Sequence, residues 1–70
     1  MNEIIDSRRI AKNIRELRIN NKLTLEELAD SIGYSLRHIM RFEKEGTMNL
    51  AVVNMFARFF NVSVKSILFN

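Results

Sequence analysis

The sequence predicts an all-α fold, in which five helices form one compact domain over residues 1–70. The chain has no proline and only two glycines, so few positions interrupt a helix. Hydrophobic residues make up 47% of the 70 residues, which is enough for one core and leaves no room for a second domain. A polar residue between two apolar residues also recurs five times, and this pattern is typical of helix starts.

The first helix is expected at residues 7–20, after the polar residue Asp6. The Asp6 side chain can accept a hydrogen bond from the first turn, and its apolar neighbours can pack together. Asn20 and Asn21 can close the helix because asparagine enters the left-handed conformation at low cost. Helical spacing places three residues on one buried face: Ile10, Ile14 and Leu17.

The second helix is expected at residues 25–32 and carries the clearest start signal. Thr24 can cap it, and Glu27 at the third helical position can accept a bond from the Thr24 amide, which completes a capping box. Gly33 then ends the helix and begins a tight turn. Helical spacing indicates a buried face made of Leu25, Leu28, Ala29 and Ile32.

The third helix is expected at residues 36–44, between Ser35 as its cap and Gly46 as its stop, with Ile39 and Phe42 on its buried face. Its opposite face combines two guanidinium groups with two flexible apolar side chains: Leu36, Arg37, Met40 and Arg41. We interpret this face as a reader of DNA base edges, because arginine bonds guanine and apolar groups meet the thymine methyl. The alternative is that its two apolar residues pack under a neighbouring helix.

The fourth and fifth helices are expected at residues 50–60 and 64–69, after the caps Asn49 and Ser63. The buried face of the fourth helix is indicated by Leu50, Val53, Ala57 and Phe60. A second apolar surface spans both helices and comprises Val52, Met55, Phe59, Val64, Ile67 and Phe69. We hypothesise that part of this surface forms a symmetric homodimer, and the alternative is that the fifth helix covers it within one chain.

The charge pattern points to nucleic acid more than the net charge does. Eleven Lys and Arg residues against eight Asp and Glu residues give a formal charge of +3. The basic residues concentrate in the first and third helices, whereas the second helix is acidic. This distribution indicates either ordinary solvated helix faces or a surface that follows a phosphate backbone.

The composition gives no indication of an enzyme or a metal site. Cysteine is absent, and neither a carboxylate pair nor a ligand cluster accompanies the single histidine, His38. We therefore expect no catalytic role and no cofactor, and we assign His38 to solvent or to a phosphate contact.

The sequence also lacks the features of an exported or membrane protein. Acidic residues at Glu3 and Asp6 do not fit a signal peptide. The longest apolar run, from Leu50 to Val53, is far shorter than the roughly 20 residues of a membrane span. We expect a cytoplasmic protein with no membrane contact.

The chain resembles the phage-repressor, or Xre-type, helix-turn-helix family, which includes the Cro and lambda repressor DNA-binding domains. The resemblance lies in residues 23–46, LTLEELADSIGYSLRHIMRFEKEG, and in residues 48–69, MNLAVVNMFARFFNVSVKSILF. It implies a compact five-helix domain in which the second and third helices form the helix-turn-helix and the third enters the major groove. Family members commonly bind paired half-sites as homodimers.

The resemblance also implies roles for residues at matching positions. Base contacts are implied for Leu36, Arg37, Met40 and Arg41. Phosphate contacts are implied for Thr24, Ser35, Lys44, Thr47 and Asn49. An ion pair between Arg18 and Glu43 would join the first helix to the recognition helix, while Ala29 and Gly33 would let the second and third helices cross closely.

Some positions depart from the family pattern. Leu25 stands where a glutamine is frequent, and Leu36 and Met40 replace polar readers. The expected function is a sequence-specific regulator of transcription that binds double-stranded DNA, as a small bacterial or phage repressor. The apolar departures support one alternative, a protein-interaction module of the antitoxin or adaptor kind.

Overall fold

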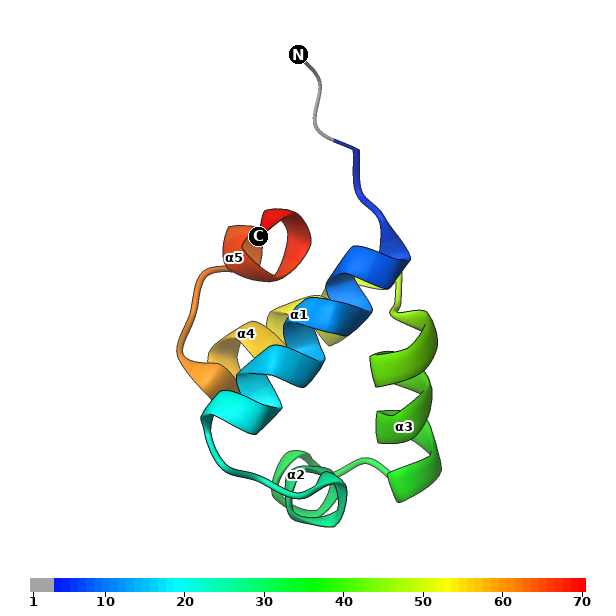
Figure 1. Ribbon diagram of the computed structural model, residues 1–70, viewed down its shortest axis with the longest axis vertical. Helices are drawn as coiled ribbons and strands as arrows, with labels where there is room; N and C mark the ends of the chain where they lie inside the picture. Colours follow the sequence, from blue (N-terminus) through cyan, green and yellow to red (C-terminus); the bar gives the residue numbers. More distant parts are fainter. Residues whose placement is uncertain (1–3) are drawn as a thin grey trace.

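The computed structural model describes residues 4–70, and these residues form five helices and no strand (Figure 1). The first three residues of the predicted domain, Glu3 among them, lie outside the described residues. The helices are α1 (Ser7–Asn20), α2 (Leu25–Ile32), α3 (Leu36–Glu45), α4 (Leu50–Phe60) and α5 (Val64–Phe69). The all-α prediction is confirmed, and the only boundary that differs is the end of α3, which extends one residue to Glu45.

Each helix begins at the cap that the sequence indicates. The side chains of all five caps accept a hydrogen bond from a backbone amide of the first turn. At α2 the capping box is complete, because Thr24 Oγ1 accepts from the Glu27 amide at 3.0 Å and Glu27 Oε1 accepts from the Thr24 amide at 2.8 Å. Local hydrogen bonding therefore fixes where the elements start.

The end of α1 differs from the expected left-handed asparagine. Asn21 has φ −91°, and the left-handed residue is Lys22, with φ 58°. Asn21 instead stabilises the helix end with its side chain, because its Nδ2 donates to the carbonyl of Leu17 at 2.7 Å. Gly33 and Asn61 adopt the predicted left-handed conformation, with φ 85° and φ 57°, whereas Gly46 combines φ 76° with an extended ψ of −164°.

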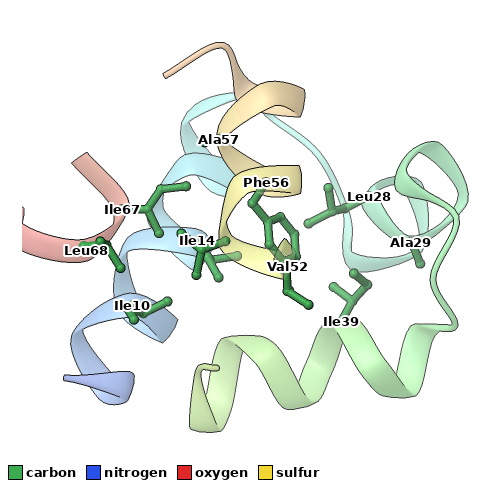
Figure 2. Close-up of a cluster of buried hydrophobic side chains, with 11 residues drawn as sticks. Ile10, Ile14, Leu28, Ala29, Ile39, Val52, Phe56, Ala57, Ile67 and Leu68 are labelled. Carbon is green, nitrogen blue, oxygen red and sulfur yellow. The ribbon is translucent and has the colours of Figure 1, made fainter. Parts of the chain in front are cut away.

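The core lies where α1, α4 and α5 meet the helix-turn-helix, and Figure 2 shows Phe56 of α4 between Ile14 of α1 and Leu28 of α2. All five helices contribute fully buried side chains. The largest of them are Phe56, Ile10, Ile14, Leu28, Ile39, Ile67 and Val53. Because so small a domain has one core, these contacts hold α3 in place.

Two residues expected on a dimer surface belong to this core. Val52 is 8% exposed and Ile67 is fully buried, and both belong to the cluster of buried hydrophobic side chains. The prediction for Leu50 is wrong in the opposite sense. It is predicted on the buried face of the fourth helix, but its side chain is 58% exposed at the first position of α4. A helical angle alone says which residues share a face, but the neighbouring helix decides which face is covered.

Asn13 fastens α5 to α1. It is a buried polar residue of α1, and its Nδ2 donates to the carbonyl of Ile67 at 2.7 Å and to that of Asn70 at 3.2 Å. Arg9 Nε also donates to the Asn70 carbonyl, at 3.1 Å. These side chains satisfy carbonyls at the end of α5 that have no partner within the helix.

The helix α3 lies along one side of the molecule, where it packs against α1 and α2 (Figure 1). Its C-terminal end is held by close contact between two backbone segments. Gly46 has φ 76°, and a Cβ atom at this position would overlap the Ser7 carbonyl oxygen at the start of α1. One face of α3 is thereby pressed against the domain, and the other is left open.

Candidate nucleic-acid interface

The open face of α3 carries the four residues implied as base contacts. Arg37 and Arg41 are exposed, and Leu36 and Met40 are 39% and 52% exposed. Ile39, on the opposite side, is fully buried. The alternative in which Leu36 and Met40 pack under a neighbouring helix is therefore wrong for this chain.

An ion pair between Arg18 and Glu43 joins α1 to α3 beside this face. Arg18 Nε donates to Glu43 Oε2 at 2.7 Å and Nη2 donates to Oε1 at 3.1 Å, which is a bidentate arrangement. Arg18 Nη1 also donates to the Leu23 carbonyl at 2.9 Å, in the loop before α2. The side chains of Arg18 and Glu43 are only 14% and 7% exposed. One guanidinium group of α1 thus connects this helix to the loop before α2 and to α3.

An open hollow of about 660 Å³ lies between α1, the start of α2 and α3. Its lining contains five cations, two carboxylates and two apolar side chains: Arg15, Arg18, Leu25, Arg37, Met40, Arg41, Glu43, Lys44 and Glu45. Arg15 and Glu45 were not among the residues predicted from the sequence. The position of Arg15, three residues before Arg18 on the same helix, was the signal that could have indicated it.

The cations of the hollow differ in how far they are neutralised. Arg18 is paired with Glu43, and Arg41 Nε lies 3.5 Å from Glu45 Oε1 in an exposed ion pair. Arg15, Arg37 and Lys44 form no ion pair within residues 4–70. Two arginines and one lysine are therefore free to meet negative charge in the hollow.

The remaining phosphate candidates are all engaged in local hydrogen bonds. Besides capping α2, Thr24 keeps its hydroxyl hydrogen, which can be donated to a ligand. The Ser35 oxygen accepts from the His38 amide at 3.2 Å and lies 2.7 Å from His38 Nδ1. Thr47 Oγ1 accepts from the Asn49 amide, and Asn49 caps α4. None of these four residues lines the hollow, whereas Lys44 does.

A helix-turn-helix family model matches residues 14–67, well over half of the chain, and so spans the whole hollow. The chain belongs to the helix-turn-helix family. The resemblance to Xre and lambda repressor domains is thereby confirmed, and the protein is a DNA-binding helix-turn-helix domain. No curated protein and no solved structure gives a significant match.

Two further properties of this helix-turn-helix domain concern other kinds of site. Between residues 4 and 70, no cluster of three or more His, Cys, Asp or Glu residues could hold a metal ion. Over the same residues, no helix is both long and apolar enough to cross a bilayer.

At the turn of the helix-turn-helix, only one of the two residues expected to allow a close crossing of α2 and α3 has that role. Ala29 is 4% exposed and packs in the core, as a small residue between helices does. A Cβ atom at Gly33, however, would have nothing within 4 Å. Glycine is needed at position 33 because the backbone φ is 85°, a value that residues with a Cβ atom rarely adopt. Close packing of the two helices is not the reason.

His38 of the helix-turn-helix lies on an aromatic surface. Its ring centroid is 5.9 Å from that of Tyr34 and 6.5 Å from that of Phe42, and Phe42 in turn packs edge-on against Phe56 in the core. The exposed imidazole therefore packs on aromatic rings that are themselves in contact with the core.

Proposed function

We propose that the chain is a sequence-specific regulator of transcription that binds double-stranded DNA, as a small bacterial or phage repressor acting in the cytoplasm. The observation that carries this proposal is the hollow beside α3, where five cations from α1 and α3 surround an exposed recognition face. A surface of this charge suits a phosphate backbone, and an exposed helix with two arginines suits the major groove.

In the proposed complex α3 enters the major groove and the flanking residues meet phosphates. Arg37 and Arg41 would donate to guanine edges, while Leu36 and Met40 would contact thymine methyl groups. Phosphate contacts are proposed for Thr24, Ser35, Lys44, Thr47 and Asn49, and Arg15 joins them because it lines the hollow without an ion pair.

A homodimer on paired half-sites remains part of the proposal, on a smaller surface than the sequence indicates. Of the apolar residues of α4 and α5, Phe59 is 39% exposed, and Met55, Val64 and Phe69 are half-buried. A two-fold dimer would place its recognition helices one turn of DNA apart, about 34–36 Å. Sedimentation that gives only monomer, with and without DNA, would exclude this dimer.

The function is tested by selecting bound sequences from a pool of random duplex DNA. We expect a defined site to be enriched, and its affinity to fall steeply with salt because phosphate contacts release counterions. The matched control is the double variant Arg37→Ala, Arg41→Ala, which removes the proposed readers and keeps Arg15 and Lys44. If wild type and double variant enrich nothing beyond the starting pool, sequence-specific binding is ruled out.

The exposed Leu36 and Met40 favour a second candidate, a protein-interaction module of the antitoxin or adaptor kind. Apolar groups at the centre of a basic surface can anchor a protein partner as well as a thymine methyl. The two candidates differ in salt dependence and selectivity. The interaction module would be favoured if the chain bound a protein partner with an affinity that does not depend on salt, and if it showed no preference among duplexes.

A further inference from the structure

Glu45, the last residue of α3, places a carboxylate beside one of the proposed base readers. Its Oε1 lies 3.5 Å from Arg41 Nε, and the two side chains are 59% and 67% exposed. Both residues line the hollow that the proposed DNA interface uses. A carboxylate is unfavourable on a surface that only attracts phosphates, because like charges repel. Its position therefore calls for a different role.

The geometry of the pair leaves the reading groups of Arg41 free. Arginine has five N–H donors, and only one of them is on Nε. Glu45 comes closest at Nε, and the guanidinium hydrogen bonds within residues 4–70 are those of Arg9 and Arg18, so the terminal fork of Nη1 and Nη2 of Arg41 donates none. This fork is the part of an arginine that bonds O6 and N7 of guanine. Glu45 can therefore hold Arg41 while the guanidinium reads a base.

Glu43, the other carboxylate that lines the hollow, is already engaged in a different ion pair. Glu43 is 7% exposed and accepts both hydrogen bonds of the bidentate pair with Arg18, so its charge is already satisfied. Glu45 is exposed and makes one looser contact. A phosphate that approached the hollow would meet the charge of Glu45 far more directly than that of Glu43.

We propose that Glu45 is a specificity-determining residue, which positions Arg41 toward a guanine edge and opposes its use as a phosphate contact. This inference rests on the proposed DNA-binding function. On unmatched DNA, Arg41 gains most by turning to a phosphate, and Glu45 opposes that by retaining the guanidinium and by repelling the phosphate. On matched DNA the free fork reaches guanine with the pair intact. Glu45 thus weakens binding to unmatched DNA more than binding to the selected site.

The chain offers a closely matched control in Lys12 and Glu16. This pair also has i,i+4 spacing within a helix, with a distance of 3.9 Å and side chains 73% and 56% exposed. Neither residue lines the hollow. Glu16→Gln therefore makes the same change in net charge and breaks the same kind of ion pair as Glu45→Gln, away from the proposed interface.

The test compares wild type, E45Q and E16Q on the duplex selected from random DNA and on a scrambled duplex of the same length. We expect E45Q to bind the scrambled duplex about 5–10-fold more tightly than E16Q does, with its log-log salt slope steeper by about 0.9 because one more phosphate contact forms. Binding of E45Q to the selected duplex should equal or fall below that of E16Q. Discrimination between the duplexes therefore falls only in E45Q.

The background variant R41A shows whether Glu45 acts through Arg41. In that background we expect E45Q and E16Q to discriminate equally between the two duplexes, because the residue to be positioned is missing and relief of phosphate repulsion strengthens binding to both duplexes alike. Equal thermal stability of E45Q and E16Q would separate the change in discrimination from a structural effect. If E45Q matches E16Q on both duplexes while wild type still discriminates, the role of Glu45 is refuted and the DNA-binding proposal stands. If wild type shows no preference between the duplexes, both are refuted.

Discussion

Arg18 of α1 binds Glu43 of α3 through two hydrogen bonds, at 2.7 and 3.1 Å, in a pair that is almost closed to solvent. The remaining contact of Arg18, to the Leu23 carbonyl, fixes the loop between α1 and α2. The pair therefore sets the position of α3 relative to the rest of the domain. It is structural, and it also borders the proposed interface.

Removal of Glu43 should destabilise the domain strongly. Glu43→Ala leaves the Arg18 guanidinium without its partner at a site that is 14% exposed, and we expect a loss of about 3 kcal/mol in the free energy of unfolding. Urea denaturation measures this loss. Glu16→Ala is the control, since it breaks an exposed ion pair and should cost less than about 0.5 kcal/mol. Equal losses in the two variants would contradict the structural role of the Arg18–Glu43 pair.

Asn13 should be needed for the docking of α5. Asn13→Ala removes the buried donor to the Ile67 carbonyl, while the Asn70 carbonyl keeps its bond from Arg9, and leaving the Ile67 carbonyl unpaired should cost about 1–3 kcal/mol. If the substitution raises the hydrogen-exchange rate of α5 amides above the wild-type rate more than it does for α2 amides, the loss of stability is local to α5. The control Asn54→Ala changes an exposed asparagine of α4 and should stay within about 0.5 kcal/mol of wild type. No change in α5 exchange would argue against the fastening role.

The two glycines should differ in their tolerance of a side chain. Gly46→Ala must move the start of α1, because the added Cβ overlaps the Ser7 carbonyl oxygen. Gly33→Ala adds no contact and pays only for its left-handed backbone, about 1 kcal/mol. Thermal unfolding should therefore show a larger loss for Gly46→Ala. A greater loss at Gly33 would mean that crowding at the turn, and not at the end of α3, limits these positions.

The helices could be predicted because their boundaries depend on neighbouring residues. The caps from Asp6 to Ser63 bond amides within the first turn, so the sequence contains both partners. The left-handed residue after α1 was misplaced because Asn21 uses its side chain to bond Leu17, which leaves the backbone reversal to Lys22. An asparagine can end a helix either with a left-handed backbone or with a side-chain bond to a helix carbonyl, and the residue type alone does not show which of the two it adopts.

Features that depend on several helices could be predicted only in part. The exposed face of α3 follows from helical angle, and the partnership of Arg18 with Glu43 follows from the family resemblance. The burial of Ile67 depends on where α5 docks, and a long-range bond from Asn13 fastens α5 there. The hollow likewise arises only when α1 and α3 lie together, so Arg15 and Glu45 emerged from the structure.

The proposed readers and the proposed phosphate contacts should fail in different ways when they are removed. Arg37→Ala should cost about 1–3 kcal/mol at the selected site and relax the preference at one base position, because a bidentate contact to guanine discriminates between bases. Lys44→Ala should weaken binding to selected and scrambled duplexes by similar factors and reduce the log-log salt slope by about 0.9. Fluorescence anisotropy on both duplexes over a range of salt concentrations measures both effects.

Arg15→Ala extends this comparison to a residue that only the structure indicates. Arg15 lines the hollow without an ion pair, so its loss should resemble that of Lys44, with a shallower salt slope and unchanged base preference. Arg58→Ala is the matched control, because Arg58 is an exposed arginine of α4 outside the hollow and its removal makes the same change in net charge. If Arg15→Ala and Arg58→Ala weaken binding equally, the effect of Arg15 is one of net charge, and the DNA backbone does not pass through the hollow at α1.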